Sequence, residues 1–177
     1  MAGVRVAAAA SDTMATVMTG ATIHVVLVYP EIHWNTGNAG RTCLATGATL
    51  HLIEPLGFSL GEREVKRAGL DYWEHVDVRV WPDWDAFERE LPALGDAFFF
   101  STKASQLLWD APLGGSENVV LVFGRETGGL PIELHERYAD RFVTIPIASP
   151  LVRSLNLSTS VAIAVYEALR QRRTAGR

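Results

Sequence analysis

The stretch NVVLVFGRETGGLP, residues 118–131, decides the fold class of this chain. It begins with a short apolar run rich in β-branched residues, which is typical of a strand that a parallel sheet buries on both faces. Glycines then permit tight turns, and Pro131 suits the first position of a helix. A buried strand, a glycine-rich loop and a helix in this order predict one unit of an α/β fold with a parallel sheet.

The same alternation of strand and helix extends from this stretch in both directions. Short apolar runs predict further strands at residues 23–29, 49–55, 76–81, 97–101 and 141–147. The spacing of apolar residues and the positions of glycine and proline predict helices at residues 36–48, 61–68, 82–91, 131–138 and 157–172. We therefore expect an α/β protein with a mainly parallel sheet and helices on both faces.

The composition is that of an ordinary globular protein. Of the 177 residues, 48% are hydrophobic and 20% are charged, and the net charge is −4 with His neutral. These values exclude a disordered charged tail, a collagen and a wholly basic nucleic-acid coat protein, but they allow a local basic patch. The single cysteine, Cys43, cannot form an internal disulfide bond and is expected in the core rather than as a nucleophile. No uninterrupted apolar run reaches the roughly 18–20 residues of a membrane helix.

The length of the chain suits one domain. We expect a flexible N-terminal extension at residues 1–22, a single domain at residues 23–173 and a tail at residues 174–177. The extension is a poor match to a secretory signal peptide, because its only short apolar run is interrupted by Arg5. We therefore expect a cytoplasmic protein.

The helix expected at residues 157–172 is apolar on more than one face. Such a helix is buried nearly all round. Two interpretations are open: a second copy of the chain covers its outer face in a dimer, or its own domain encloses it.

Three loops follow predicted strands, and parallel sheets bind ligands beyond the carboxyl ends of their strands. In the first loop, PEIHWNTGNAGR at residues 30–41, Arg41 falls one turn into the helix, where the helix dipole does not favour a positive charge. This position indicates binding of an anion or a polar substrate. An ordinary helix cap with a solvated arginine is the alternative.

The second loop is FGRETGGLP at residues 123–131. It has neither the GxGxxG nor the GxxxxGK[ST] spacing, so it predicts no dinucleotide site and no P-loop. Glu126 is placed to form hydrogen bonds with a ligand. The alternative is a carboxylate that the dipole favours at a helix N-terminus.

The third loop is IPIASPLVRSLNLSTS at residues 145–160. Arg153 and several polar side chains beside a heavily apolar helix indicate a ligand site. A cap of that helix is the alternative role of Ser154 or Asn156.

A local cluster of basic residues precedes two aromatic residues, Tyr72 and Trp73. Positive charge beside aromatic rings suits RNA phosphates and unstacked bases. A solvated charged face is the alternative. The five histidines of the chain show no metal-ligand spacing, and we predict no metal site.

Taken together, the three loops resemble the three sequence motifs of the SPOUT superfamily of knotted methyltransferases. The resemblance rests on NTGNAGR at residues 35–41, LVFGRETGGLP at residues 121–131 and IPIASPLVRSLNLSTSVAIAVYEA at residues 145–168, in matching order and spacing. It covers about residues 23–171. Within the superfamily, the chain looks most like the short tRNA 2′-O-methyltransferases that modify the wobble nucleotide, cytidine or uridine, because LHLIEPLGFSL and KRAGLDYWEH resemble stretches typical of that subgroup.

The resemblance implies a C-terminal deep trefoil knot, a homodimer with sites near the subunit interface, and S-adenosylmethionine as the cofactor. It implies methyl transfer to a ribose 2′-hydroxyl of tRNA. Two alternatives are open: 2′-O-methylation of another tRNA or rRNA site, and a non-catalytic RNA-binding relative.

By position, the resemblance also implies site residues. The expected catalytic residues are Asn35, Arg41, Glu126, Ser154 and Asn156. The expected cofactor-binding residues are Phe100, Gly124, Ile145, Ser154 and Leu155. The expected RNA-binding residues are Arg41, Arg63, Lys66, Arg67 and Arg153.

We expect Arg41 to grip a phosphate and polarise the hydroxyl rather than act as the base, because a guanidinium stays protonated in proteins. Asn35, Ser154 and Asn156 are expected to orient the ribose and the cofactor. Glu126 is expected to hold the local geometry or to offset positive charge.

Overall fold

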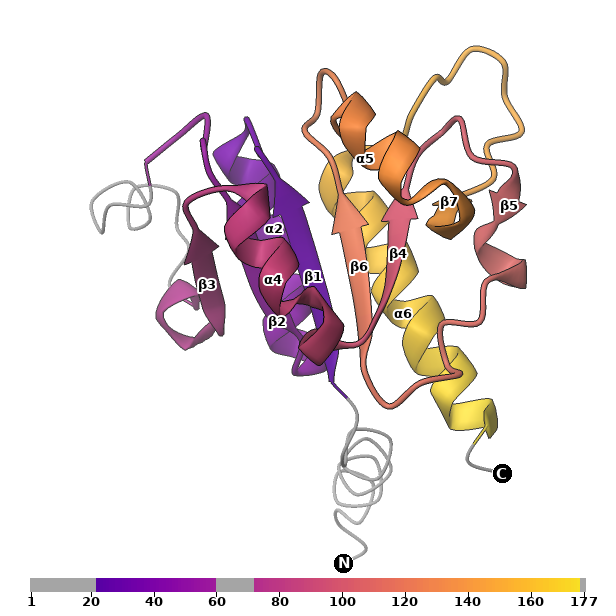
Figure 1. The fold of residues 1–177 in the computed structure, drawn as a ribbon, viewed down its shortest axis with the longest axis horizontal. Helices are drawn as coiled ribbons and strands as arrows, with labels where there is room; N and C mark the ends of the chain where they lie inside the picture. The colour runs from indigo at the N-terminus through magenta and orange to yellow at the C-terminus, as the bar shows by residue number, and fades with distance from the viewer. Residues whose placement is uncertain (1–21, 60–71, 176–177) are drawn as a thin grey trace, which may run out of the picture.

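The computed structural model describes residues 22–59 and 72–175 of the chain (Figure 1). The strands within these residues are β1 (Ile23–Val28), β2 (Thr49–Ile53), β3 (Val78–Trp81), β4 (Asp96–Phe100), β5 (Gln106–Leu107), β6 (Val119–Phe123) and β7 (Phe142–Thr144). The helices are α2 (His33–Thr46), α4 (Trp84–Leu94), α5 (Ile132–Arg137) and α6 (Leu157–Ala175), with 3-10 helices η1 (Trp73–His75), η2 (Leu108–Asp110) and η3 (Ala139–Arg141).

The described strands form one sheet in the order β3-β2-β1-β6-β4-β7-β5, and all of its strand pairs are parallel. Strand β6 lies in the middle, where Leu121 pairs with Val25 of β1 and with Phe98 of β4. Strands β1, β2 and β6 are buried along their whole length, as their continuous apolar runs predict. The predicted α/β class with a parallel sheet is confirmed.

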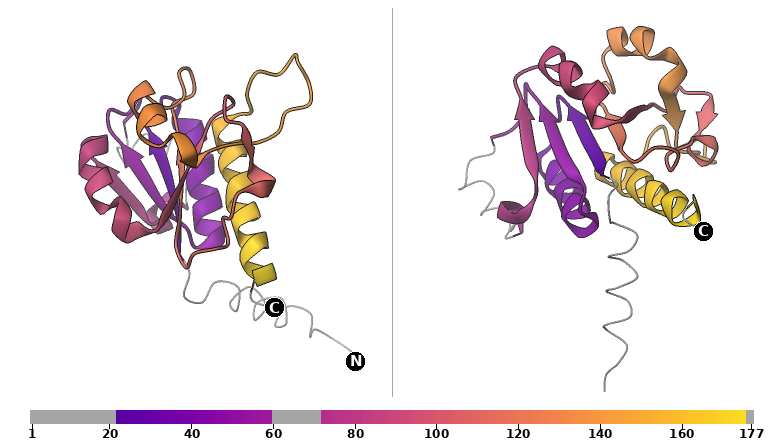
Figure 2. Two further views of the ribbon diagram at one scale, coloured as in Figure 1. Left: turned by 45° about the vertical axis from the view of Figure 1, so that its right-hand side comes forward. Right: turned by 60° about the horizontal axis from the view of Figure 1, so that its bottom comes forward.

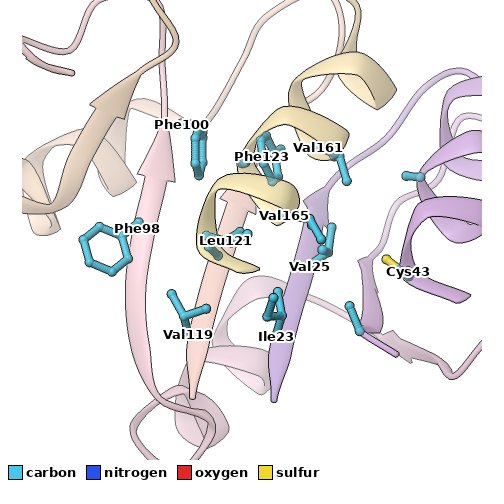
Figure 3. Packing of buried hydrophobic residues seen from close by; sticks show 14 of the residues in the cluster. Ile23, Val25, Cys43, Phe98, Phe100, Val119, Leu121, Phe123, Val161 and Val165 are labelled. Carbon is cyan, nitrogen blue, oxygen red and sulfur yellow. The ribbon is translucent and has the colours of Figure 1, made fainter. Parts of the chain in front are cut away.

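Helices cover both faces of the sheet (Figures 1 and 2). Helices α2 and α6 pack on one face, where Cys43 and Val165 belong to the same buried cluster as Val25 (Figure 3). Helices α4 and α5 pack on the other face and contribute Phe87 and Leu134 to a second cluster. Because successive residues of a strand point to opposite faces, each central strand contributes to both clusters.

Several helix boundaries differ from the prediction for local reasons. Helix α2 begins at His33 rather than at residue 36, and it ends before Gly47, which takes the left-handed conformation at φ 69°. Helix α4 begins after Asp83, whose side chain accepts a hydrogen bond from the main-chain N–H of Ala86 at 2.7 Å. Strand β5 has no predicted counterpart, because two residues are too short to show a periodic pattern. The helix predicted at residues 61–68 lies outside the described residues.

Helix α6 begins at Leu157 as predicted and continues to Ala175. Val161, Ala164 and Val165 are fully buried, whereas Tyr166 is 54% exposed. The domain therefore encloses one side of the helix and leaves the side with Tyr166 open. Among residues 22–59 and 72–175, no helix is long and apolar enough to cross a membrane.

Candidate functional site

The three loops meet at one edge of the sheet. They follow β1, β6 and β7, and the carboxyl ends of parallel strands lie at the same edge. A cavity of about 760 Å³ opens at this edge, within the range of small-molecule sites. Residues 100–103 after β4 and residues of the second and third loops line it, whereas no residue of the first loop does. All five residues predicted to bind the cofactor line this cavity: Phe100, Gly124, Ile145, Ser154 and Leu155.

Two aromatic rings form an apolar wall of the cavity. Phe100 of β4 and Phe123 of β6 stack with ring centroids 4.4 Å apart and an interplanar angle of 15°. Both rings stand at the ends of adjacent parallel strands, so the pairing of the sheet itself sets their position. Such a wall suits a flat aromatic ring of a ligand.

Glycines shape the loop after β6. A Cβ atom on Gly124 would lie 2.0 Å from the carbonyl carbon of Gly129, so only glycine fits at this close approach. Gly129 takes a positive φ of 68°, and its N–H donates to the carbonyl oxygen of Arg125 at 2.9 Å. Residues 125–129 therefore form a tight turn, which lies against the cavity.

Glu126 binds the beginning of α2. Its Oε1 accepts hydrogen bonds from the side-chain amide of Asn35 at 2.9 Å and from the main-chain N–H of Ile32 at 3.2 Å. Its Oε2 accepts the main-chain N–H of Glu31 at 2.8 Å. Glu126 is therefore a carboxylate at a helix N-terminus, which is one of the two interpretations of its sequence position. The helix is α2, however, and not the helix that follows Glu126 in the chain.

Asn35 continues this chain of hydrogen bonds to the third loop. The side-chain amide of Asn156 donates to Oδ1 of Asn35 at 2.8 Å. The Oδ1 atom of Asn156 accepts the main-chain N–H groups of Ser158, at 2.9 Å, and Thr159, at 3.3 Å, at the start of α6. Asn156 therefore caps α6, as one sequence interpretation held, and it also joins the third loop to the first. Glu126, Asn35 and Asn156 connect all three loops.

Arg41 lies outside the lining of the cavity. It is exposed on α2, and its guanidinium carbon stands 4.6 Å from the centroid of the Tyr72 ring. The Tyr72 hydroxyl donates to the carbonyl oxygen of Gly37 at 3.0 Å, which fixes the ring against the helix. A cation over an aromatic face is held in a defined place while its N–H groups stay free to bind an anion.

The structure describes only one of the other predicted RNA-binding residues. Arg153 lines the cavity, whereas Arg63, Lys66 and Arg67 lie outside the described residues. Two cations that the sequence analysis did not single out, Lys103 and Arg125, also line the cavity. Their only sequence signal was their position after predicted strands.

Two further groups bear on chemistry. Burial and the nearby Lys103 lower the pKa of His135, which also lines the cavity. Cys43 is fully buried in the core, and burial raises the pKa of its thiol to about 12, which confirms its expected structural role. Among residues 22–59 and 72–175, no three His, Cys, Asp or Glu side chains are grouped to hold a metal ion.

Comparison with known proteins assigns this arrangement to a family. Residues 22–166 match the SpoU rRNA Methylase family. The chain is 52% identical over 151 residues to the tRNA (cytidine(34)-2'-O)-methyltransferase of Burkholderia cenocepacia (strain HI2424), covering 84% of this chain and 94% of that protein.

Two solved structures share the fold. One, described as giving structural insights into the 2-OH methylation of C/U34 on tRNA, has a TM-score of 0.79 at 45% identity and covers 89% of this chain and 99% of that one. The AdoMet-bound rRNA methyltransferase from Sinorhizobium meliloti has a TM-score of 0.75 at 27% identity and covers 86% of this chain and 57% of that one.

Proposed function

The chain belongs to the SpoU rRNA Methylase family, and on this premise we propose that it methylates the ribose 2′-hydroxyl of the wobble nucleotide, cytidine or uridine, in tRNA anticodon loops. The methyl donor is S-adenosylmethionine, as in the AdoMet-bound relative. The observation that carries the proposal is one cavity between the segments that follow β4, β6 and β7, with the first loop tied to the second and third loops through Glu126, Asn35 and Asn156. The choice of tRNA rests on the relative that is 52% identical over nearly its whole length.

The residues that line the cavity fit the cofactor. The stacked Phe100 and Phe123 offer an apolar wall for an adenine ring. Lys103, Arg125 and Arg153 bring positive charge for the carboxylate of the methionine part. Gly124 lets the main chain of Gly129 and Leu130 pass close to the end of β6, and this closes the turn beside the cavity.

The reaction forms a C–O bond and breaks a C–S bond, and the hydroxyl proton leaves. The cofactor, when bound, supplies an activated methyl group on a sulfonium. The chain must hold the ribose hydroxyl in line with that methyl, which is worth several kcal/mol through orientation. Arg41 binds a phosphate and polarises the hydroxyl, and water or phosphate accepts the proton, since a guanidinium is not a base under these conditions.

The hydrogen bonds support positioning roles for three of the five catalytic candidates. Glu126, Asn35 and Asn156 already satisfy one another and two helix N-termini. They hold the loops that carry Ser154 and the cavity wall, and Ser154 is placed at the cavity to orient the substrate. This agrees with the role in local geometry expected for Glu126.

The assembly is part of the same proposal. We propose a homodimer, supported by the exposed Tyr166 on α6, Trp34 on α2 and Leu151 in the third loop, which is 91% exposed. Arg41 lies outside the cavity lining of its own chain, which fits a site near a subunit interface.

We also propose that the C-terminal part forms a trefoil knot. Strand β7 lies between β4 and β5, both of which precede it in the chain. After β7 the chain crosses from the face of the sheet that α5 covers to the face that α6 covers. Residues 23–173 are proposed as the single domain, between an extension at 1–22 and a tail at 174–177. A tRNA substrate favours a cytoplasmic location.

A methylation assay tests the function. Full-length protein is incubated with S-adenosylmethionine and unmodified tRNA transcripts carrying C or U at position 34, and the 2′-O-methyl group is mapped. The expected product is methylated at nucleotide 34 alone, and a matched transcript with a 2′-deoxy nucleotide at that position stays unmodified. Methylation of rRNA but not tRNA rejects the substrate. Binding of RNA without binding of S-adenosylmethionine identifies a non-catalytic relative.

A further inference from the structure

Glu31 of the first loop exchanges hydrogen bonds with Glu126 and Thr127 of the second loop. The main-chain N–H of Glu31 donates to Oε2 of Glu126 at 2.8 Å. In the opposite direction, the main-chain N–H of Thr127 donates to Oε2 of Glu31 at 3.1 Å. The Thr127 hydroxyl also lies 2.8 Å from that oxygen and 2.9 Å from Oε1. Because Glu126 and Thr127 are neighbours, each loop holds the other by a side chain and by its main chain.

The turn to which Glu31 is bonded forms one wall of the cavity. Thr127, Gly128 and Gly129 line the cavity, whereas Glu31 does not. The turn has little packing of its own, since these three residues are exposed and a Cβ on Gly129 would meet no atom within 4 Å. A turn with so little burial depends on its hydrogen bonds for a single conformation.

We propose that Glu31 is a positioning residue that fixes the turn of residues 125–129 through Thr127. It thereby holds one wall of the cavity in the conformation that binds the cofactor. Glu31 reaches the ligand only through Thr127, because it does not line the cavity itself. The identity of the ligand rests on the proposed function.

The chemistry of the contact predicts which substitutions preserve it. Thr127 presents two donors, its N–H and its hydroxyl, to one carboxylate. Alanine at position 31 removes both acceptors. Glutamine keeps an amide oxygen for the N–H of Thr127 and offers an N–H to the oxygen of its hydroxyl, so the link survives without the charge.

Binding of S-adenosylmethionine to the full-length protein, measured by calorimetry, is the first test. Glu31→Ala is expected to weaken binding about tenfold and Glu31→Gln by no more than about twofold. The double variant Glu31→Ala with Thr127→Val is expected to bind no more weakly than Glu31→Ala alone, because both changes break one link. Glu136→Ala, which removes an exposed carboxylate from α5, is the matched control and is expected to bind like the wild type.

Amide hydrogen exchange of the ligand-free protein is the second test, and it does not depend on the cofactor. In Glu31→Ala, the amide of Thr127 is expected to exchange faster, while the amides of β6 keep their wild-type rates. Faster exchange throughout β6 would mean a general loss of stability and would overturn the proposal. So would wild-type binding and wild-type exchange at Thr127 in Glu31→Ala, or weaker binding by the double variant than by Glu31→Ala alone. If the wild type binds no S-adenosylmethionine, the proposed function fails, and exchange at Thr127 still decides whether Glu31 orders the turn.

Discussion

Lowering the pH is predicted to destabilise the fold through a buried histidine pair. His24 on β1 and His51 on β2 lie side by side, with Nδ1 of His24 3.0 Å from Nε2 of His51. The indole N–H of Trp81 on β3 donates to Nδ1 of His51 at 3.0 Å. Since Trp81 can only donate, Nδ1 of neutral His51 must accept, and its proton sits on Nε2 and points to His24. A second proton on His51 would face the Trp81 N–H.

The size of the effect follows from the pKa of His51. Burial lowers this pKa from 6.5 to about 3, with smaller contributions from His24 and Arg79 that outweigh the opposing Asp77. Burial also lowers the pKa of His24. In the unfolded chain His51 takes up a proton below pH 6.5, whereas in the fold it stays neutral until about pH 3. Stability is therefore lost as the pH falls through this window, by about 1.4 kcal/mol per pH unit for His51.

Denaturation by urea at pH 7.5 and at pH 5.0 measures the free energy of unfolding. His51 alone is expected to lower this free energy by about 2 kcal/mol between the two pH values. Because carboxylates also titrate in this range, the comparison needs His51→Gln, which keeps one acceptor and one donor but does not titrate. The wild type is expected to lose about 2 kcal/mol more than His51→Gln. His75→Gln, which removes an exposed histidine from η1, is expected to behave like the wild type. Equal losses in wild type and His51→Gln would refute the reasoning.

Three further predictions concern the site. Arg41→Ala is expected to lower turnover by about 100-fold or more. The affinity for S-adenosylmethionine is expected to stay near the wild-type value, because Arg41 lies outside the cavity lining. Equal losses of turnover and affinity would contradict this role. Tyr72→Leu is expected to lower kcat about tenfold by removing the ring under Arg41, whereas Tyr72→Phe keeps the ring and is expected to retain most activity. Equal kcat values in the two variants would show that the contact between Arg41 and the ring does not contribute to turnover. Reversing the charges of Arg63, Lys66 and Arg67 is expected to weaken tRNA binding and to reduce its dependence on salt, measured by filter binding, and an unchanged salt slope would place the RNA surface elsewhere.

The fold was predictable because the informative patterns were long and buried. Continuous apolar runs identified β1 and β6, and the buried face of α6 was evident from its composition. The predictions that were wrong or missing concern local features. Helix α4 begins after Asp83 and not at Pro82, and β5 is too short to be recognised from the sequence. These features depend on one side chain or on two residues, so no periodic signal reports them.

From the residues alone, the site was predictable only as far as individual loops, and the grouping of the five cofactor candidates around one cavity came from the family resemblance. Asn156 shows why: its role as a cap could be read from the residues that follow it, but its bond to Asn35, 121 residues away, depends on how the strands are ordered. Glu31 had no such local role, and its contact with Thr127 exists only because β1 and β6 are neighbours in the sheet. Polar residues that act by joining loops are therefore invisible until the topology is known. Since Glu126, Asn35 and Asn156 are all engaged in such joints, we expect the chemical step to depend on the two catalytic candidates outside them, Ser154 in the cavity lining and Arg41 on α2 beyond that lining.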